Sequence, residues 1–369
     1  MSDYNSAERR YKVMLIIQSL RVGGAETMVE NLAYALGDIG CVVCVVVLQP
    51  GETMITSRMQ RRGVDLIMMD KKPGADLKLI GRLAKTMQDF RPDVVHSHLP
   101  ILHYVAPAAK RAGINNLVHT LHNMASKETK SNLKAAYYGH LYRSGVVRPV
   151  ALSEITAESV VERYKVLPES VAIVSNGIDL SLYGRKNGYG IKDTLEIAHI
   201  GRFEEAKNHV LIVECARILK ERGVPARFHL YGVGSLLNEV KDRVDAFQLS
   251  DVVLFHGLTD NVPQALARAD AFIFPSLYEG MPMVLAEAMA SGLPIVASRA
   301  GGIPNMVEDG ESALLCDLEA SKFADALQEL CSSELLRERL GTAALERSSD
   351  FGSEAMASSY YSVYTKRWR

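Results

Sequence analysis

Two glutamates eight residues apart, Glu279 and Glu287, are the first candidate ligands in this sequence. Glu279 lies in a loop between the apolar run 271–274 and a helical pattern that begins near Met283. Backbone N–H groups at a helix start bind anions, and Gly280 lets an anion approach the backbone closely. Carboxylates beside an anion are reasonable only if they accept hydrogen bonds from hydroxyl groups, such as those of ribose or a hexose. The segment therefore predicts a site for a compound that carries both phosphate and sugar.

The alternative for these glutamates is structural: Glu279 caps a helix and Glu287 is solvated. The neighbours of Glu287 in residues 285–290 are apolar, which argues against a solvated acid. We therefore assign Glu279 a catalytic role and predict that the rest of the segment binds the ligand through Gly280, Met281, Met283 and Glu287.

A second loop carries the positive charge that such a ligand requires. The apolar run 195–200 ends at Gly201, and Arg202 and Lys207 follow before the next helical pattern. Arginine offers a bidentate fork and lysine a point charge, and both suit phosphate. Cations held there would stabilise charge that develops on a leaving diphosphate. Two unrelated surface charges are the alternative interpretation.

Glycines follow several of the predicted strands. Gly23 and Gly24 follow the first one, where glycine permits a ligand to approach the backbone. The GxGxxG spacing of dinucleotide-binding proteins is absent, and a plain tight turn is the alternative. Further along, predicted strands are followed by Gly232, Gly234, Gly257 and Leu258, where ordinary turns are one interpretation.

Four of the ten histidines, His96, His98, His119 and His122, cluster at two predicted strand ends. A shared metal ion is one interpretation. It is weakened because His119 and His122 are three residues apart and point to different sides of a strand. Burial with satisfied hydrogen bonds is the default for His96 and His119, and His98 is a weaker candidate for a contact to acceptor or sugar.

Apolar runs of strand length alternate with helical patterns along the whole chain, which predicts α/β architecture with parallel sheets. The rhythm breaks near Gly177 and through the polar, glycine-rich stretch 183–193. We therefore predict two Rossmann-like domains, residues 1–182 and 190–352, and a C-terminal helix over 353–369 that packs back on the first. Loops at the strand ends of both domains should face a common cleft.

Composition excludes several classes of protein. No apolar run reaches the roughly 20 residues that cross a bilayer, and the N-terminus at residues 1–4 is polar, so we expect a cytoplasmic protein with its five cysteines reduced. Residues 1–185 hold 23 Lys and Arg against 17 Asp and Glu, and the remainder 19 against 26. A near-neutral chain without a basic and aromatic patch gives no support for nucleic-acid binding.

The combined motifs resemble the retaining glycosyltransferases of family four, the bacterial group 1 enzymes with the GT-B fold. The resemblance rests on Glu279 to Glu287 with their flanking residues and on four further segments, residues 23–26, 93–98, 175–179 and 201–208. It implies that Arg202 and Lys207 neutralise the donor diphosphate and that His122 contacts the transferred sugar. It also implies that Glu279 binds this sugar and Glu287 the ribose. The turns that it implies beside the nucleoside are those at Gly232, Gly234, Gly257 and Leu258.

The resemblance implies a nucleotide-diphosphate-sugar donor, UDP-linked first and GDP-linked next, and a glycan acceptor that is lipid-linked or a polysaccharide precursor. No two aspartates stand two apart, so the DxD metal motif is missing, and we predict catalysis without a metal or other cofactor. A nucleotide-sugar epimerase, a phosphorylase and a non-catalytic nucleotide-sugar-binding subunit are the alternatives.

The basic first half would suit peripheral contact with an anionic membrane face. Residues 127–143 include Lys127, Lys130, Lys134 and Arg143 around a short apolar stretch at 135–138, which fits an interfacial helix. A helix packed into the core is the alternative.

Overall fold

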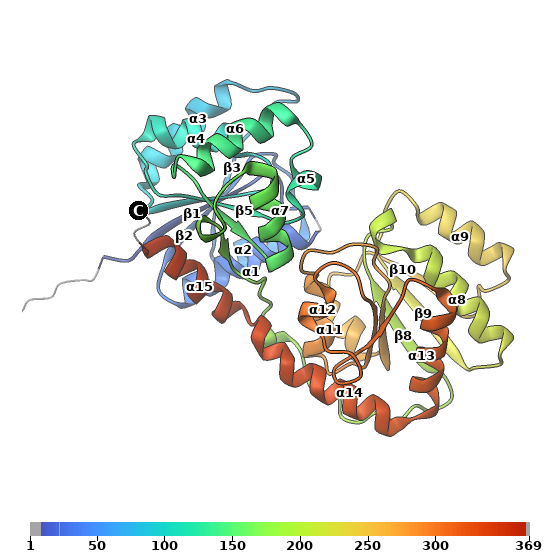
Figure 1. Cartoon of the computed structure of the whole chain (residues 1–369). Helices are drawn as coiled ribbons and strands as arrows, with labels where there is room; N and C mark the ends of the chain where they lie inside the picture. Colours follow the sequence, from blue (N-terminus) through green and yellow to red (C-terminus); the bar gives the residue numbers. More distant parts are fainter. Residues whose placement is uncertain (1–8, 22, 367–369) are drawn as a thin grey trace, which may run out of the picture. The chain divides into compact units, whose positions relative to one another are not determined.

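The computed structural model describes residues 9–21 and 23–366, and its chain divides into two α/β units (Figure 1). The first unit comprises the described parts of Met1–Gly177 and Ser353–Arg369, and the second is Ile178–Gly352. Residues 178–182, which the sequence analysis assigns to the first domain, belong to the second unit. This segment is tied to the end of the second unit, because the Ile178 N–H donates to the Phe351 carbonyl at 2.9 Å. The polar N-terminus, Val22 and the last three residues of the predicted C-terminal helix lie outside the described residues.

The first unit is built around a seven-stranded parallel sheet of order β3-β2-β1-β4-β5-β6-β7. Its elements are β1 (Lys12–Ile17), α1 (Gly24–Asp38), β2 (Val42–Val47), α2 (Met54–Arg61), β3 (Asp65–Met68), α3 (Lys78–Phe90), β4 (Val94–His98), α4 (Leu102–Ala112), β5 (Leu117–Leu121), α5 (Ala125–Glu128), α6 (Asn132–Arg143), β6 (Arg148–Ala151), α7 (Glu154–Tyr164), the 3-10 turn η1 (Pro168–Ser170), β7 (Ala172–Ile173) and α15 (Ser353–Thr365).

The second unit holds a six-stranded parallel sheet of order β10-β9-β8-β11-β12-β13. Its elements are the 3-10 turn η2 (Leu180–Leu182), β8 (Leu195–Ile200), η3 (Glu205–Lys207), α8 (His209–Glu221), β9 (Ala226–Tyr231), α9 (Leu237–Ala246), β10 (Val253–Gly257), α10 (Val262–Ala267), β11 (Ala271–Phe274), α11 (Met283–Ala290), β12 (Ile295–Ser298), α12 (Ile303–Met306), β13 (Leu314–Cys316), α13 (Ala320–Ser332), α14 (Glu334–Arg347) and η4 (Ser348–Phe351).

The central strands of both sheets are buried on both faces. In β1 the residues from Val13 to Ile17 are fully buried, and β11 is buried along its whole length. Helices on both faces of a parallel sheet leave no solvated side, so such strands are continuous apolar runs and not alternating ones. The predicted α/β class with parallel sheets is confirmed.

Helix α15 belongs to the first unit although it follows the second in sequence (Figure 1). Its Tyr364 hydroxyl lies 2.7 Å from Nδ1 of the buried His96, whose Nε2 lies 2.8 Å from the Thr120 hydroxyl. Tyr360 lies 2.9 Å from the same hydroxyl of Thr120. These contacts join α15 to β4 and β5, and they satisfy both ring nitrogens of His96.

Replacement of Tyr364 by phenylalanine should destabilise the first unit by about 1–3 kcal/mol, because His96 Nδ1 would stay buried without a partner. Urea unfolding followed by tyrosine fluorescence measures the change. Tyr361→Phe is the matched control, since Tyr361 lies on the same helix with 38% of its surface exposed. Equal stability of the two variants would contradict the account of α15.

Candidate active site

The strand order of the second sheet reverses between β8 and β11. The loops after these strands leave the sheet in opposite directions from adjacent positions, and open α/β sheets bind ligands at this point. Residues 201–208 form the loop after β8 and residues 275–282 the loop after β11. The two loops are joined, since the Leu277 N–H donates to the Ala206 carbonyl at 2.8 Å. The fold therefore places both predicted donor-binding segments side by side.

Lys207 and Glu279 form an ion pair between these loops. Their side chains are 20% and 15% exposed, and the Lys207 ammonium lies 4.9 Å from the centroid of the Phe274 ring. Partial burial strengthens the pair and fixes the direction of both groups. Arg202 is exposed on the same loop as Lys207. The structure thus brings three of the four predicted catalytic residues to one strand-end region.

The loop that carries Glu279 rests on a glycine pair that the sequence analysis overlooks. Gly301 and Gly302 follow β12, and the Gly302 N–H donates to the Glu279 carbonyl at 2.9 Å. A Cβ on Gly302 would lie 1.9 Å from the Gly280 carbonyl oxygen, and one on Gly301 would lie 2.2 Å from that of Glu279. Two adjacent glycines after a predicted strand are the same signal that Gly23 and Gly24 give, so the pair could have been found.

Gly232 and Gly234 have a comparable role beneath the basic loop. A Cβ on Gly232 would lie 2.0 Å from the Gly201 carbonyl oxygen, and one on Gly234 would lie 2.4 Å from that of Phe203. The φ of Gly232 is 139°, which side chains rarely allow. The requirement for glycine is therefore explained by packing of one loop on another. Gly257 closes the neighbouring strand, and its carbonyl accepts from the Gly232 N–H at 2.7 Å, while the next residue, Leu258, is 50% exposed.

Glu287 lies in the middle of α11 and is only 8% exposed. Burial raises the pKa of its carboxyl group to about 7, and a hydrogen bond from Tyr183 lowers it in part. A carboxylate held in such a place gains from a ligand that donates hydroxyl hydrogen bonds. The N-cap residue of α11, Pro282, makes no side-chain cap hydrogen bond to the first turn, which begins at Met283.

The predicted histidines of the first unit lie together at the ends of β4 and β5. His98 Nδ1 lies 3.1 Å from His122 Nε2, and the His119 Nδ1 lies 2.7 Å from the Ser97 hydroxyl. Burial lowers the pKa of His119 to about 3 and that of His122 to about 4. These rings are neutral at pH 7, so they act as hydrogen-bonding groups and not as cations.

His122 is half-buried at the start of a loop that Glu128 organises. One carboxylate oxygen of Glu128 accepts from the backbone N–H of His122 at 2.7 Å and of Asn123 at 3.1 Å. Burial raises the Glu128 pKa to about 8. Because His98 holds Nε2 of His122, the ring orientation is fixed. Neither His98 nor Glu128 has a recognisable motif in the sequence for this positioning role.

Gly23 and Gly24 stand at the N-terminus of α1. The Glu26 carboxylate folds over Gly23, with one oxygen 2.5 Å from the position that a Cβ would take. Gly24 has no atom within 4 Å of its own Cβ position. The loop thus has open space on one side and an acid on the other.

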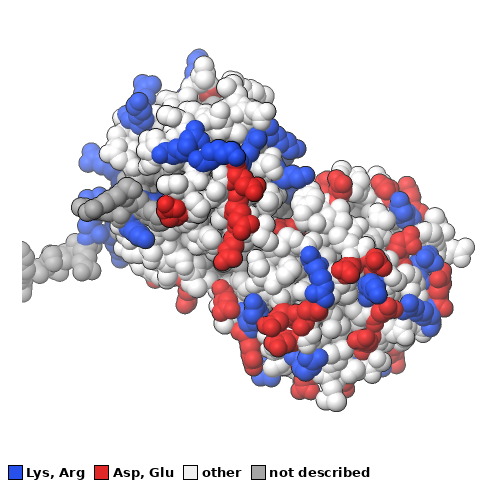
Figure 2. Space-filling model, in the orientation of Figure 1, with Lys and Arg blue, Asp and Glu red and all other residues white. Residues whose placement is uncertain are grey.

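Residues 127–143, for which an interfacial helix and a core-packed helix were the alternatives, include helix α6. Ala135, Tyr138 and Tyr142 face the core, while Leu133 is 83% and Tyr137 38% exposed. One face of the helix is therefore packed, as the core alternative requires. Within the described part of the chain, no helix is both long and apolar enough to span a bilayer. Figure 2 shows basic side chains in a row across the first unit and interspersed acidic and basic side chains on the second.

Two family models match the chain, one for each unit. The model described as glycosyltransferase family 4 matches residues 22–182, and the one described as glycosyl transferases group 1 matches residues 186–347. Among curated proteins, the chain is 29% identical over 307 residues to the N-acetyl-alpha-D-glucosaminyl L-malate synthase of Bacillus anthracis, with 79% of each chain covered. It is 27% identical over 280 residues to the UDP-Gal:alpha-D-GlcNAc-diphosphoundecaprenol alpha-1,3-galactosyltransferase of Escherichia coli, covering 71% of this chain and 72% of that protein.

A solved structure shares the fold over nearly the whole chain. HepE of Anabaena, crystallised in complex with UDP and glucose, matches with a TM-score of 0.84 at 19% identity and covers 96% of this chain and 99% of its own. The predicted GT-B fold, with two Rossmann-like parallel-sheet domains, is confirmed by this likeness.

Replacing Gly302 by alanine should lower the free energy of unfolding of the second unit by about 1–3 kcal/mol, because the new methyl group overlaps the Gly280 carbonyl. Gly188→Ala is the control, since no atom lies within 4 Å of that Cβ position, and its effect should stay within about 0.5 kcal/mol. Thermal unfolding of both variants measures the difference. A Gly302→Ala variant as stable as the control would show that the loops are not in contact.

Proposed function

Because the chain belongs to the group 1 glycosyltransferases of family 4, we propose that it transfers a hexose or N-acetylhexosamine from a UDP-sugar to a glycan acceptor with retention of configuration. The observation that carries this proposal is the Lys207–Glu279 ion pair at the strand-order reversal of the second sheet. It combines a cation for phosphate with a carboxylate for sugar hydroxyls. We assign the donor to the second unit and the acceptor to the first.

Charge and burial support this donor assignment. Arg202 and Lys207 supply two positive charges from one loop, which complements a diphosphate. Glu279 and the buried Glu287 supply two acceptors for hydroxyl groups on different elements. In the proposed arrangement Glu279 accepts from the transferred sugar and Glu287 from the ribose. Gly280, Met281 and Met283 border the diphosphate at the start of α11, and the turns at Gly232, Gly257 and Leu258 border the nucleoside.

The proposed chemistry is a front-side displacement. The bond from the anomeric carbon to the diphosphate oxygen breaks while the acceptor oxygen attacks from the same face, and the departing phosphate oxygen takes the acceptor proton. Arg202 and Lys207 stabilise the negative charge that develops on the leaving group, as preorganised cations do best. We propose that this charge stabilisation makes a metal ion unnecessary.

The first unit contributes His122 to the proposed reaction. Its pKa of about 4 keeps the ring neutral, so it donates or accepts a hydrogen bond at the transferred sugar and adds no charge to it. The glycine loop at Gly23 and Gly24 gives the proposed acceptor and donor phosphate close access to the backbone.

The nature of the acceptor is proposed from the relatives. The Escherichia coli relative is named for UDP-galactose and a diphosphoundecaprenol-linked acceptor, and the Bacillus anthracis relative for L-malate. HepE was crystallised with UDP. UDP is accordingly the proposed nucleotide, ahead of GDP, and a lipid-linked or polysaccharide-precursor glycan is the proposed acceptor. Peripheral contact of the exposed face of α6 with an anionic membrane is part of the same proposal.

Lys207→Ala and Glu279→Ala should each reduce turnover of the preferred UDP-sugar by at least about a hundredfold, because each removes a group that contacts the reacting part of the donor. Release of UDP and sugar transfer, measured together, give the rate. Lys220→Ala is the matched control, since it breaks an exposed ion pair with Asp251 in the same unit. Its turnover should stay within about twofold.

Near-normal turnover in both site variants would contradict the assignment. Conversion of the UDP-sugar to an epimer without acceptor would favour the epimerase alternative. Tight UDP-sugar binding without any product would favour a non-catalytic subunit.

Glu287 predicts a pH dependence of nucleotide binding. Its pKa is raised to about 7, so the carboxylate that accepts from ribose is lost as the pH falls through 7. The Kd for UDP should therefore rise by up to about tenfold per pH unit below 7. A phosphate group titrates near pH 6 as well, so Glu287→Gln, measured with the same ligand, isolates the protein's contribution. Identical pH profiles for both proteins would contradict the ribose assignment.

A further inference from the structure

The first unit has a cavity of about 220 Å³ beyond the carboxyl ends of its strands. It is lined by Gln18, Lys71, Gly74, Pro100, Ile101, His103, Tyr104 and Lys134. Gln18 follows β1 and Pro100 follows β4, and the strand order of the first sheet reverses between these two strands. The cavity therefore occupies in the first sheet the place where open α/β sheets bind ligands.

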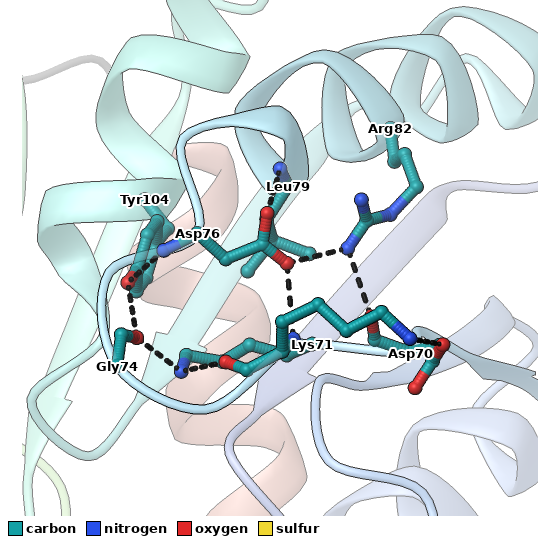
Figure 3. A network of polar contacts seen from close by, with 8 residues as sticks. Asp70, Lys71, Gly74, Asp76, Leu79, Arg82 and Tyr104 are labelled. Carbon is teal, nitrogen blue, oxygen red and sulfur yellow. Dashed lines mark hydrogen bonds and ion pairs between the residues drawn. The ribbon is translucent and has the colours of Figure 1, made fainter.

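The loop between β3 and α3 forms one wall of this cavity, and its polar contacts hold it in a defined shape (Figure 3). The Asp76 carboxylate accepts from Arg82 at 2.8 Å, from the Lys72 N–H of the loop at 3.1 Å and from the Leu79 N–H in the first turn of α3 at 3.2 Å. The Asp76 N–H in turn donates to the Tyr104 hydroxyl at 3.2 Å. The Asp76 carboxylate is thereby paired with groups of the loop and of α3, and Asp76 is only 7% exposed.

Lys71 is held by carbonyl groups and not by an acid. Its ammonium donates to the carbonyls of Lys72 at 3.0 Å and Gly74 at 2.9 Å, and it lies 5.7 Å from the Tyr104 ring centroid. Lys134 reaches the same cavity from α6. Among the described residues, neither lysine has a carboxylate within ion-pair distance, and none of the residues that line the cavity is acidic. The cavity consequently carries two uncompensated positive charges.

His103 lies on the cavity wall and adds a neutral donor. Burial, followed by the charges of Lys134 and Lys71, lowers its pKa to about 4. The Tyr138 hydroxyl lies 2.9 Å from His103 Nδ1. In the tautomer whose Nδ1 accepts from Tyr138, the ring proton of His103 lies on Nε2 and can be donated to a ligand.

We propose that this cavity binds a phosphate group of the acceptor, held by Lys71 and Lys134 with His103 as a neutral donor. A phosphate monoester carries a charge of about −1.5 to −2, which balances two lysines. The cavity is smaller than the roughly 300–1,000 Å³ clefts that hold whole drug-sized ligands, so it suits one head group. The phosphate belongs to a soluble phosphate ester or to a lipid-linked phosphate, and both present the same chemistry.

The assignment of this phosphate to the acceptor rests on the proposed function. Phosphate binding in the cavity can be tested without measuring turnover. Binding of inorganic phosphate to the full chain is measured by calorimetry in saturating UDP, so that the donor site is occupied. Lys71→Gln and Lys134→Gln should each weaken phosphate binding by at least about tenfold. Both variants should bind UDP as the unmodified protein does.

Lys72→Gln is the matched control, because Lys72 is next in sequence, exposed and paired with Asp70 outside the cavity. Its phosphate affinity should be unchanged. Phosphate binding that is absent from the unmodified protein, or unaffected by both cavity variants, would overturn the proposal. If the unmodified protein binds phosphate but not UDP, the proposed donor site is contradicted, while the cavity remains a phosphate site.

Two further probes identify the source of the phosphate. A soluble ester is supported if glycerol 3-phosphate competes with inorganic phosphate and the protein does not bind phosphatidic acid vesicles. Vesicle binding that inorganic phosphate displaces and that Lys71→Gln and Lys134→Gln reduce supports a lipid-linked phosphate. Binding of either probe that is insensitive to these two variants would count against the cavity.

Discussion

The reversal of strand order between β8 and β11 is the constraint on which the second unit's site depends. Two loops that leave a parallel sheet in opposite directions can meet only there, and here they meet through the Lys207–Glu279 ion pair and the Leu277 to Ala206 hydrogen bond. The glycines at 232, 234, 301 and 302 supply the space for this meeting, since any side chain at these positions would overlap a neighbouring carbonyl. A cation and a carboxylate 72 positions apart in the chain are thereby brought into one ion pair.

The first sheet repeats the same topology with different chemistry. Its order also reverses, between β1 and β4, and a cavity with two lysines lies at that point. Its histidines at β4 and β5 are kept neutral by burial, whereas no described acid lies within ion-pair distance of the two lysines. The two units thus share a fold and a reversal of strand order, while the side chains at that point differ in kind: cation and carboxylate in one, cations and neutral imidazole in the other.

Much of the fold could be predicted from the sequence. Buried parallel strands are unbroken apolar runs, and their alternation with helices fixes the class. The loop residues Arg202, Lys207 and Glu279 could be identified because each follows such a run. Their mutual contact could not, because it depends on which strands are neighbours. Lys71, His103 and Lys134 come from three separate elements without a motif, so only the folded chain reveals them together. The placement of residues 178–182 in the second unit likewise could not be predicted, because it depends on the long-range contact of Ile178 with Phe351.

The central claim is that Lys207 meets the diphosphate and Glu279 the transferred sugar. Calorimetric affinities for UDP and for the tightest-binding UDP-sugar, measured on Lys207→Met and Glu279→Gln, separate the two roles most directly. The account predicts that Lys207→Met weakens both ligands by a similar factor, whereas Glu279→Gln weakens the UDP-sugar at least about tenfold and changes UDP by less than about twofold. Equal losses for UDP and UDP-sugar in Glu279→Gln, or unchanged UDP affinity in Lys207→Met, would contradict it.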